Sequence, residues 1–221
     1  SNNIFLNEKL LARVKSIYDK KEQLNLSTED AKLLEDLYES FKANGATLNK
    51  DDKEKYRKLS MDLSMLTLQF DQNALKDKNR FELLITDENE LSGLPESARD
   101  AAAMLAKSKD KDGWLFNLSA PSYIPFMRYS DKRDLREKMY REYMSVGNKG
   151  DEFDNKDIIK KIVNIRLEIA QLMGFKNYAE YALEHTMAKN SANVYKLLNQ
   201  LLEAYKPIAI NEYNAVEGFA L

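Results

Sequence analysis

The sequence carries one histidine and no cysteine among its 221 residues, which limits the metal chemistry it can perform. A catalytic zinc site built on one helix needs two histidines at positions i and i+4, with a glutamate between them as general base. His185 alone cannot supply that motif. A carboxylate-bridged di-metal bundle needs Glu-x-x-His pairs, and the residue three positions before His185 is Ala182. The sequence therefore predicts no catalytic residue and no metal ligand in this chain.

Acidic residues are numerous, but their positions indicate capping and solvation rather than catalysis. Most lie in the expected first turns of helices or among lysines, where a carboxylate is stabilised by the positive helix end. Those residues are Asp30, Asp51, Asp52, Asp134 and Asp157. Glu168 and Arg166 are two residues apart and cannot face each other on a helix. We expect each of them to pair with another helix and to have a structural role.

Three aromatic residues are the only candidates for contact with a substrate. They are Tyr123, Phe126 and Tyr129, in a segment that also contains Pro121 and Pro125. Tyrosine offers a flat apolar body and a hydroxyl group, so these rings could line a groove for a peptide backbone. The competing interpretation is that they pack at the junction of two subdomains, and the sequence favours it.

Composition excludes several classes of partner. Apolar residues make up 43% of the chain and charged residues 32%, with a net charge of −2 and both signs interspersed. This pattern does not favour a nucleic acid or an anionic membrane as partner. No apolar run approaches the roughly 18 residues that a membrane span requires.

The hydrophobic periodicity predicts a mainly α fold. Expected helices cover about 4–22, 27–43, 50–77, 96–107, 131–146, 155–172 and a last helix from about 192, which Pro207 should kink. The helix over 50–77 contains no glycine or proline and carries two apolar stripes. One includes Leu59 and Leu63, and the other consists of Met61, Met65 and Leu68. Two apolar faces predict burial on two sides.

One small β element interrupts the helices. Residues 81–85 and 114–118 alternate in hydropathy and have equal length, so we expect them to pair as two antiparallel strands. Residues 119–130, with their two prolines, are expected to form a non-helical link. We place the domain boundary there, with an N-terminal part over 1–120 and a C-terminal part over 121–221.

Ordered sequence matches along nearly the whole chain resemble a known family. The matches are Leu63-Ser64, Phe70, Asn73, Phe81, Glu90 to Pro95, Arg136, Tyr140, Tyr143, Asn155, Ile158, Arg166, Glu168, Ala170, Leu172 to Phe175, Asn177 to Ala179, Tyr181, Met187 and Ala188. They resemble the thimet oligopeptidase and peptidyl-dipeptidase family of zinc metallopeptidases, in particular the bacterial peptidyl-dipeptidases. The resemblance implies a neurolysin-like, multi-helix fragment that lacks the catalytic half of the family.

The same resemblance implies what the parent protein does. In this family two helical halves enclose a deep channel, and an HExxH helix with a third glutamate ligand holds zinc. This chain would then form one channel wall, partnered by the catalytic half, around short peptides that lose C-terminal dipeptides. Zinc is expected in the parent and no cofactor in this fragment. We expect the cytoplasm as its compartment, with the periplasm as the alternative.

The alternative from another class is a free-standing helical module that binds a protein or peptide in a groove. The C-terminal residues discriminate between the two hypotheses. A complete module should cap its last helix, whereas Val216, Phe219 and Leu221 indicate a continuing chain. At the other end, Ser1-Asn2 resembles the scar left by removal of an expression tag.

Overall fold

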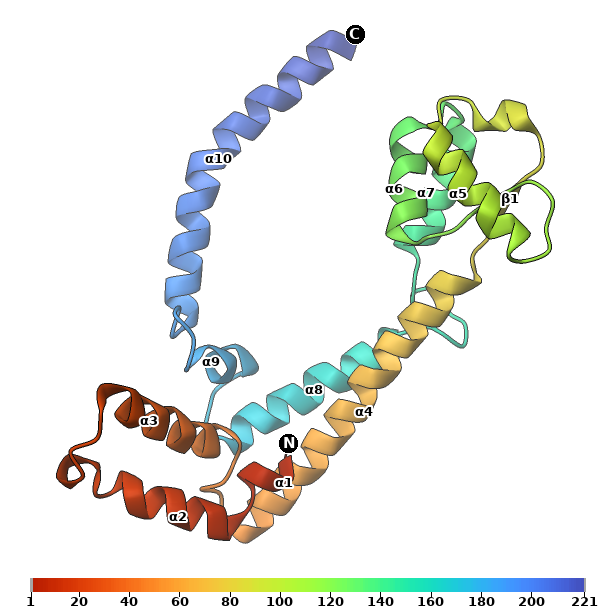
Figure 1. Ribbon diagram of the computed structural model, residues 1–221. Coiled ribbons are helices and arrows are strands. Elements are labelled where there is room, and N and C mark those ends of the chain that lie inside the picture. The colour runs from red at the N-terminus through yellow and green to blue at the C-terminus, as the bar shows by residue number, and fades with distance from the viewer. Residues whose placement is uncertain (1, 221) are drawn as a thin grey trace. The chain divides into compact units, whose positions relative to one another are not determined.

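The computed structural model describes residues 2–220 (Figure 1). The chain divides into two compact units. The terminal unit joins the residues up to Leu63 with those from Asn164 onward, and the central unit runs from Ser64 to Val163. The fold is mainly α with one two-stranded antiparallel sheet, so the predicted fold class is confirmed. Ser1 and Leu221, on which the predictions about the two ends partly depend, lie outside the described residues.

The elements follow one another in the order that the sequence predicts, with two exceptions described below. Those of the terminal unit are α1 (Asn2–Phe5), α2 (Glu8–Tyr18), α3 (Thr28–Ala43), the start of α4 (Lys50–Arg80), the end of α8 (Lys156–Leu172), α9 (Tyr178–Leu183) and α10 (Ser191–Ala220). Those of the central unit are the rest of α4 and α8, β1 (Leu83–Ile85), α5 (Glu96–Lys107), β2 (Trp114–Phe116), α6 (Ala120–Tyr129) and α7 (Arg133–Met144).

The prediction of a single helix over 4–22 is wrong, because this part of the chain forms two separate helices, α1 and α2. The side chain of Asn7 accepts hydrogen bonds from the backbone N–H groups of Lys9 and Leu10, both at 3.1 Å. An asparagine that caps a helix in this way fixes its first turn and excludes its own residue from the helix. Two further caps act in the same way, with Ser27 accepting from Asp30 N before α3 and Asn49 from Asp52 N before α4.

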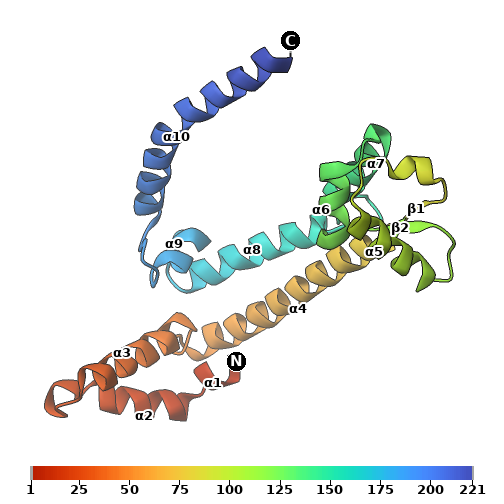
Figure 2. The same cartoon turned by 45° about the horizontal axis from the view of Figure 1, so that its top comes forward.

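Two apolar clusters hold the terminal unit together. Figures 1 and 2 show α2 and α3 side by side, and Val14 and Phe41 are buried between them. The second cluster packs the end of α8 against the start of α4, with Tyr56 and Ile169 in its buried part. Tyr181 of α9 joins this cluster and donates a hydrogen bond to the carbonyl oxygen of Ala43 at 2.7 Å.

Helix α4 is one continuous helix, as predicted, but its second apolar stripe is not buried. Met61, Met65 and Leu68 are 57%, 60% and 58% exposed. The prediction of burial on two sides is therefore wrong for this chain. The physical reason is that periodicity reports which side chains are apolar, whereas burial also needs a partner, and none of the described residues covers this stripe.

Helix α10 is a stronger case of the same kind. From Tyr195 to Phe219 every residue is exposed, although the helix is rich in leucine, isoleucine and tyrosine. The predicted helix is confirmed, and Figure 1 shows that its axis bends along its length, which contains Pro207. Asn190 caps it by accepting from Asn193 N at 3.0 Å.

The central unit is organised around the small sheet. Leu83 pairs with Phe116 and Ile85 with Trp114, so the predicted antiparallel pairing is confirmed, and Figure 2 shows α5 beside the two strands. The inward side chains of both strands enter one core with residues from α5, α6 and α7. The buried members of that core are Phe81, Leu83, Ile85, Leu91, Leu94, Ala102, Phe116, Leu118, Phe126 and Met139.

The expected non-helical link over 119–130 is wrong, since Ala120–Tyr129 is helical. Pro121 lies in the first turn, where its missing N–H would have had no partner within the helix. Pro125 removes a single donor, and the helix continues past it because Phe126 is anchored in the core.

The expected domain boundary after residue 120 falls inside the central unit. The rings of Phe116 and Phe126, which lie on either side of it, meet edge to face with centroids 4.8 Å apart. The division into 1–120 and 121–221 as domains of a parent protein stays a prediction.

A buried carboxylate fastens the loop between α7 and α8 to α4. Asp77 is fully buried, accepts a hydrogen bond from Gly147 N at 2.7 Å, and forms ion pairs with Arg80 and Lys149. Arg80 also pairs with Asp151 in the same loop, and this hydrogen bond is the main cause that lowers the pKa of Asp151. Because the pKa of the folded state is the lower one, this contribution to stability is present above the ordinary value of 3.8 and is lost as the pH falls.

A tight backbone approach at Gly93 leads to a first prediction. Gly93 has a φ of +84°, and a Cβ atom there would overlap the carbonyl oxygen of Tyr129. Gly150 has a similar φ of +73° but open space around it. Replacing Gly150 with alanine should cost only the left-handed backbone strain, about 1–2 kcal/mol. Replacing Gly93 should lower the free energy of unfolding by more, because backbone must also move.

Urea denaturation of both variants measures this difference. Equal midpoints for the two alanine variants would show that the segment at Gly93 can move aside without cost.

Candidate functional site

The three aromatic residues predicted to line a groove lie on α6 but differ in burial and in their contacts. Phe126 is fully buried in the core of the central unit, where its ring meets Phe116. Tyr123 is half-buried and packs on the edge of that core, and Tyr129 is 45% exposed beside the guanidinium group of Arg128. They therefore do not form one continuous surface. Whether any of them contacts a substrate stays a prediction.

Tyr123 is part of a cluster of tyrosines between α6 and α7. Its ring stacks on that of Tyr143, with centroids 4.3 Å apart and an angle of 17° between their planes. Burial raises the pKa of Tyr123, and the nearby Tyr143 and Tyr140 add to this effect. The hydroxyl group therefore stays protonated at neutral pH and can act as a hydrogen-bond donor rather than as a base.

Beside this cluster, α6 and α7 form an open groove of about 420 Å³. Its lining residues recur at helical spacing along α7, with one methionine from α6. They are Met127, Arg133, Arg136, Glu137, Tyr140 and Arg141. The apolar stripe of α7 does not indicate this groove, because the groove lies beside the charged residues of the helix. The signal that could have found it is the spacing of 133, 136, 137, 140 and 141, which places three arginines on one face.

The charges in the groove are only partly compensated. Glu137 is paired with Arg141, whose Nε donates to it at 2.7 Å. Arg136 donates to the carbonyl oxygen of Ser130, and neither it nor Arg133 pairs with a carboxylate among the described residues. The groove thus presents two guanidinium groups without a carboxylate partner, next to the exposed ring of Tyr140.

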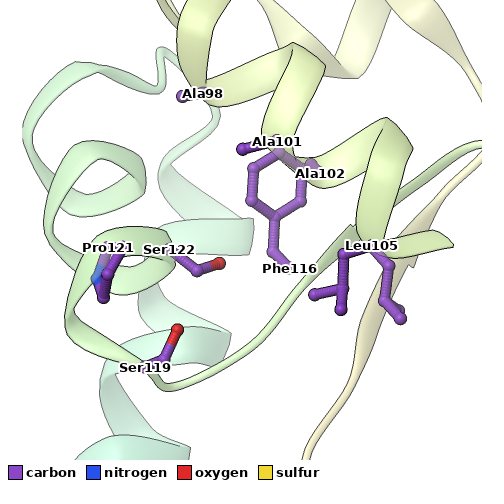
Figure 3. A pocket seen from close by; sticks show the side chains of 9 residues that line it. Ala98, Ala101, Ala102, Leu105, Phe116, Ser119, Pro121 and Ser122 are labelled. Carbon is purple, nitrogen blue, oxygen red and sulfur yellow. The ribbon is translucent and has the colours of Figure 1, made fainter. Parts of the chain in front are cut away.

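A second hollow, of about 140 Å³, lies between α5, β2 and α6 (Figure 3). Figure 3 shows the small side chains of Ala98, Ala101 and Ala102 on one side of it and two serines on another. The hydroxyl group of Ser119 donates to the side chain of Asn117, and that of Ser122 accepts from the backbone N–H of Asn117. Both hydroxyl groups are therefore already engaged, and the hollow offers shape but little chemistry.

The residues present do not fit a zinc site. Among residues 2–220, no three histidine, cysteine, aspartate or glutamate side chains converge where they could hold a metal ion. His185 is exposed after α9, with its Nε2 3.4 Å from a carboxylate oxygen of Glu184. Two donors from neighbouring exposed residues do not organise the three or four ligands that zinc requires.

The expected pairing of Arg166 and Glu168 with other helices is confirmed, and their structural role stays a prediction. The guanidinium group of Arg166 lies 5.2 Å from the ring centre of Tyr178 on α9, and Glu168 lies 4.0 Å from Lys55 on α4. Each residue thus contacts a different helix from its own. None of the helices between residues 2 and 220 combines the length and hydropathy needed to cross a lipid bilayer.

Comparisons with known proteins point to one family. Residues 126–220 match the model of peptidase family M3. Oligopeptidase A of Salmonella typhimurium is 36% identical over 199 residues, which are 88% of this chain and 29% of that protein. Oligopeptidase A of Escherichia coli is 34% identical over 96% of this chain and 32% of its own length. Dipeptidyl carboxypeptidase of Escherichia coli is 30% identical over 99% of this chain, again 32% of that protein. The chain thus spans less than a third of these relatives.

Proposed function

The chain belongs to peptidase family M3, and from this premise we propose that it forms a helical, non-catalytic portion of a zinc peptidase that cleaves short peptides. The observation that carries the proposal is the match to oligopeptidase A over 88–96% of this chain. The donor set described above does not fit zinc, so the metal ligands of the parent would come from polypeptide outside this chain.

The exposed apolar helix α10 supports the proposal. A helix that is apolar on more than one side is stabilised by burial within a larger protein, and large exposed apolar patches mark surfaces that bind other polypeptide. Leu198, Ile208 and Phe219 are 51%, 52% and 93% exposed. We propose that the catalytic segment of the parent protein covers this helix.

The face of α6 and α7 supports a role as a wall around peptide substrates. Tyr129 on α6 and Tyr140 on α7 are each about half exposed, whereas Phe126 is fully buried. An exposed tyrosine can pack on a peptide and donate a hydrogen bond to its backbone. Of the three predicted channel residues, Tyr129 is thus the best placed for such a contact and Tyr123 the next.

The identities favour the oligopeptidase branch of the family over the predicted peptidyl-dipeptidase branch. Oligopeptidase A relatives are 34–36% identical to this chain, and dipeptidyl carboxypeptidase relatives 28–30%. The second branch remains the other candidate because its match covers 99% of this chain. Both candidates are peptidases, and matches of this extent support a peptidase portion rather than a free-standing binding module.

A graft tests the proposed function. This chain would replace the matched segment of Escherichia coli oligopeptidase A, and cleavage of short blocked peptides would be followed by mass spectrometry. We expect the graft to cleave them, while the isolated chain does not. Internal cuts support the oligopeptidase branch, and stepwise loss of C-terminal dipeptides supports the other.

The matched control is a second graft that carries the corresponding segment of Haemophilus influenzae oligopeptidase A. If this control is active and the graft of the present chain is folded but inactive, the proposal is wrong.

A further inference from the structure

Two arginines in the groove between α6 and α7 are poised to bind an anion. Arg133 and Arg136 lie on successive turns of α7 at a spacing of i and i+3, and both line the groove. The one carboxylate in its lining, Glu137, is already engaged by Arg141. We infer that this groove binds an acidic side chain of a peptide, with its carboxylate between the guanidinium groups of Arg133 and Arg136.

The chemistry of the groove favours a carboxylate on a peptide. A guanidinium group presents paired N–H donors that match the two oxygens of a carboxylate. Arg136 is half-buried and has only the Ser130 carbonyl oxygen as a partner among the described residues. A carboxylate there would accept hydrogen bonds from the remaining N–H donors of Arg136. Because this position is partly shielded from solvent, the charge interaction would be stronger than in bulk water.

Apolar surface beside the arginines distinguishes a peptide from a simple anion. Met127 is half-buried on α6, and the ring of Tyr140 is half exposed, so both can pack against side chains next to the acidic one. The volume of about 420 Å³ lies within the range of ligand sites, roughly 300–1,000 Å³. The chain as a whole carries a net charge of −2, which does not favour a nucleic acid as the ligand.

The inference rests on the proposed function and sharpens it, since it names peptides with an acidic residue as those that this wall prefers. Binding to the isolated chain tests it without any cleavage. The probes are an acetylated and amidated hexapeptide, Ala-Phe-Glu-Glu-Phe-Ala, and the same peptide with glutamine in place of both glutamates. The blocked ends ensure that only side chains carry charge.

Isothermal titration calorimetry at low ionic strength compares the two peptides. We expect the 221-residue chain to bind the acidic peptide about five- to tenfold more tightly, and this ratio to shrink in 0.5 M salt. The variant R133Q/R136Q should bind both peptides with equal affinity. The exposed Lys138 on the same helix does not line the groove, so K138Q is the matched control and should keep the preference.

Equal affinities for the two peptides overturn the inference, as does an equal loss of preference in K138Q and R133Q/R136Q. The inference would also be contradicted if a short DNA strand displaced the bound acidic peptide at a lower concentration than an added excess of the same peptide does. If the double variant is unfolded by circular dichroism, the single variant R133Q decides, because Arg133 is exposed. None of these outcomes touches the proposed function, which the graft tests separately.

Discussion

Replacing Asp77 with alanine is expected to lower the free energy of unfolding by roughly 3–5 kcal/mol. The carboxylate is fully buried and is surrounded by Gly147 N–H, Arg80 and Lys149. Removing it leaves the buried Gly147 donor without its partner and takes one of two carboxylate partners from Arg80, which keeps Asp151, and from Lys149, which keeps Glu142. The loop between α7 and α8 should then lose its attachment to α4.

The control for this variant is Asp157 on α8. Its ion pair with Lys160 is exposed on both sides, so its alanine variant should change stability by less than about 1 kcal/mol. Urea denaturation followed by circular dichroism measures both. A D77A midpoint close to that of the D157A variant would mean that the buried network contributes little to the stability of the central unit.

Replacing Phe126 with alanine is expected to cost about 3–5 kcal/mol of unfolding free energy. Its ring is fully buried and meets Phe116 edge to face, so the truncation leaves a cavity in the core of the central unit. The alanine variant of Tyr129, three residues along the same helix and 45% exposed, should change stability by about 0.5 kcal/mol or less.

This pair of variants separates packing from contact with a substrate. We expect Y129A to keep its stability and to alter cleavage by the grafted peptidase, while F126A loses stability. Full stability of the F126A variant would show that the ring is not part of the core and would restore it as a channel residue.

Local signals in the sequence were sufficient to predict most of the elements. Helix α5 has the predicted limits of 96 and 107, and the equal alternating segments around 81–85 and 114–118 do pair. Capping residues such as Ser27 and Asn49 act within three residues of themselves, so their effect can be predicted without a fold.

What could not be predicted depends on neighbours that are distant in the sequence. Helix α6 forms in spite of two prolines because Phe126 is buried in the core. The helix propensities of its residues do not include the free energy of that burial. Met61 and Met65 are the opposite case, in which a predicted burial is absent because no described residue packs on them. An apolar stripe indicates that a partner is needed but does not show that the chain provides one.

The candidate site was predicted only in part. The sequence singled out three aromatic residues of α6, whose contact with a substrate stays a prediction, but periodicity could not show that Phe126 is buried while Tyr129 is exposed. The arginines of α7 were overlooked because charges on a helix are usually solvated. Their significance arises from the groove with Met127, which only the packing of α6 on α7 creates.

The most direct test of the account is the zinc content of the purified 221-residue chain after incubation with zinc and dialysis, beside that of the oligopeptidase A graft. We expect far less than one zinc per isolated chain and about one per graft, because a single histidine and scattered carboxylates cannot assemble a zinc site. About one tightly held zinc per isolated chain, with chelator-sensitive peptide cleavage, would contradict the account and show that this chain has a catalytic centre of its own.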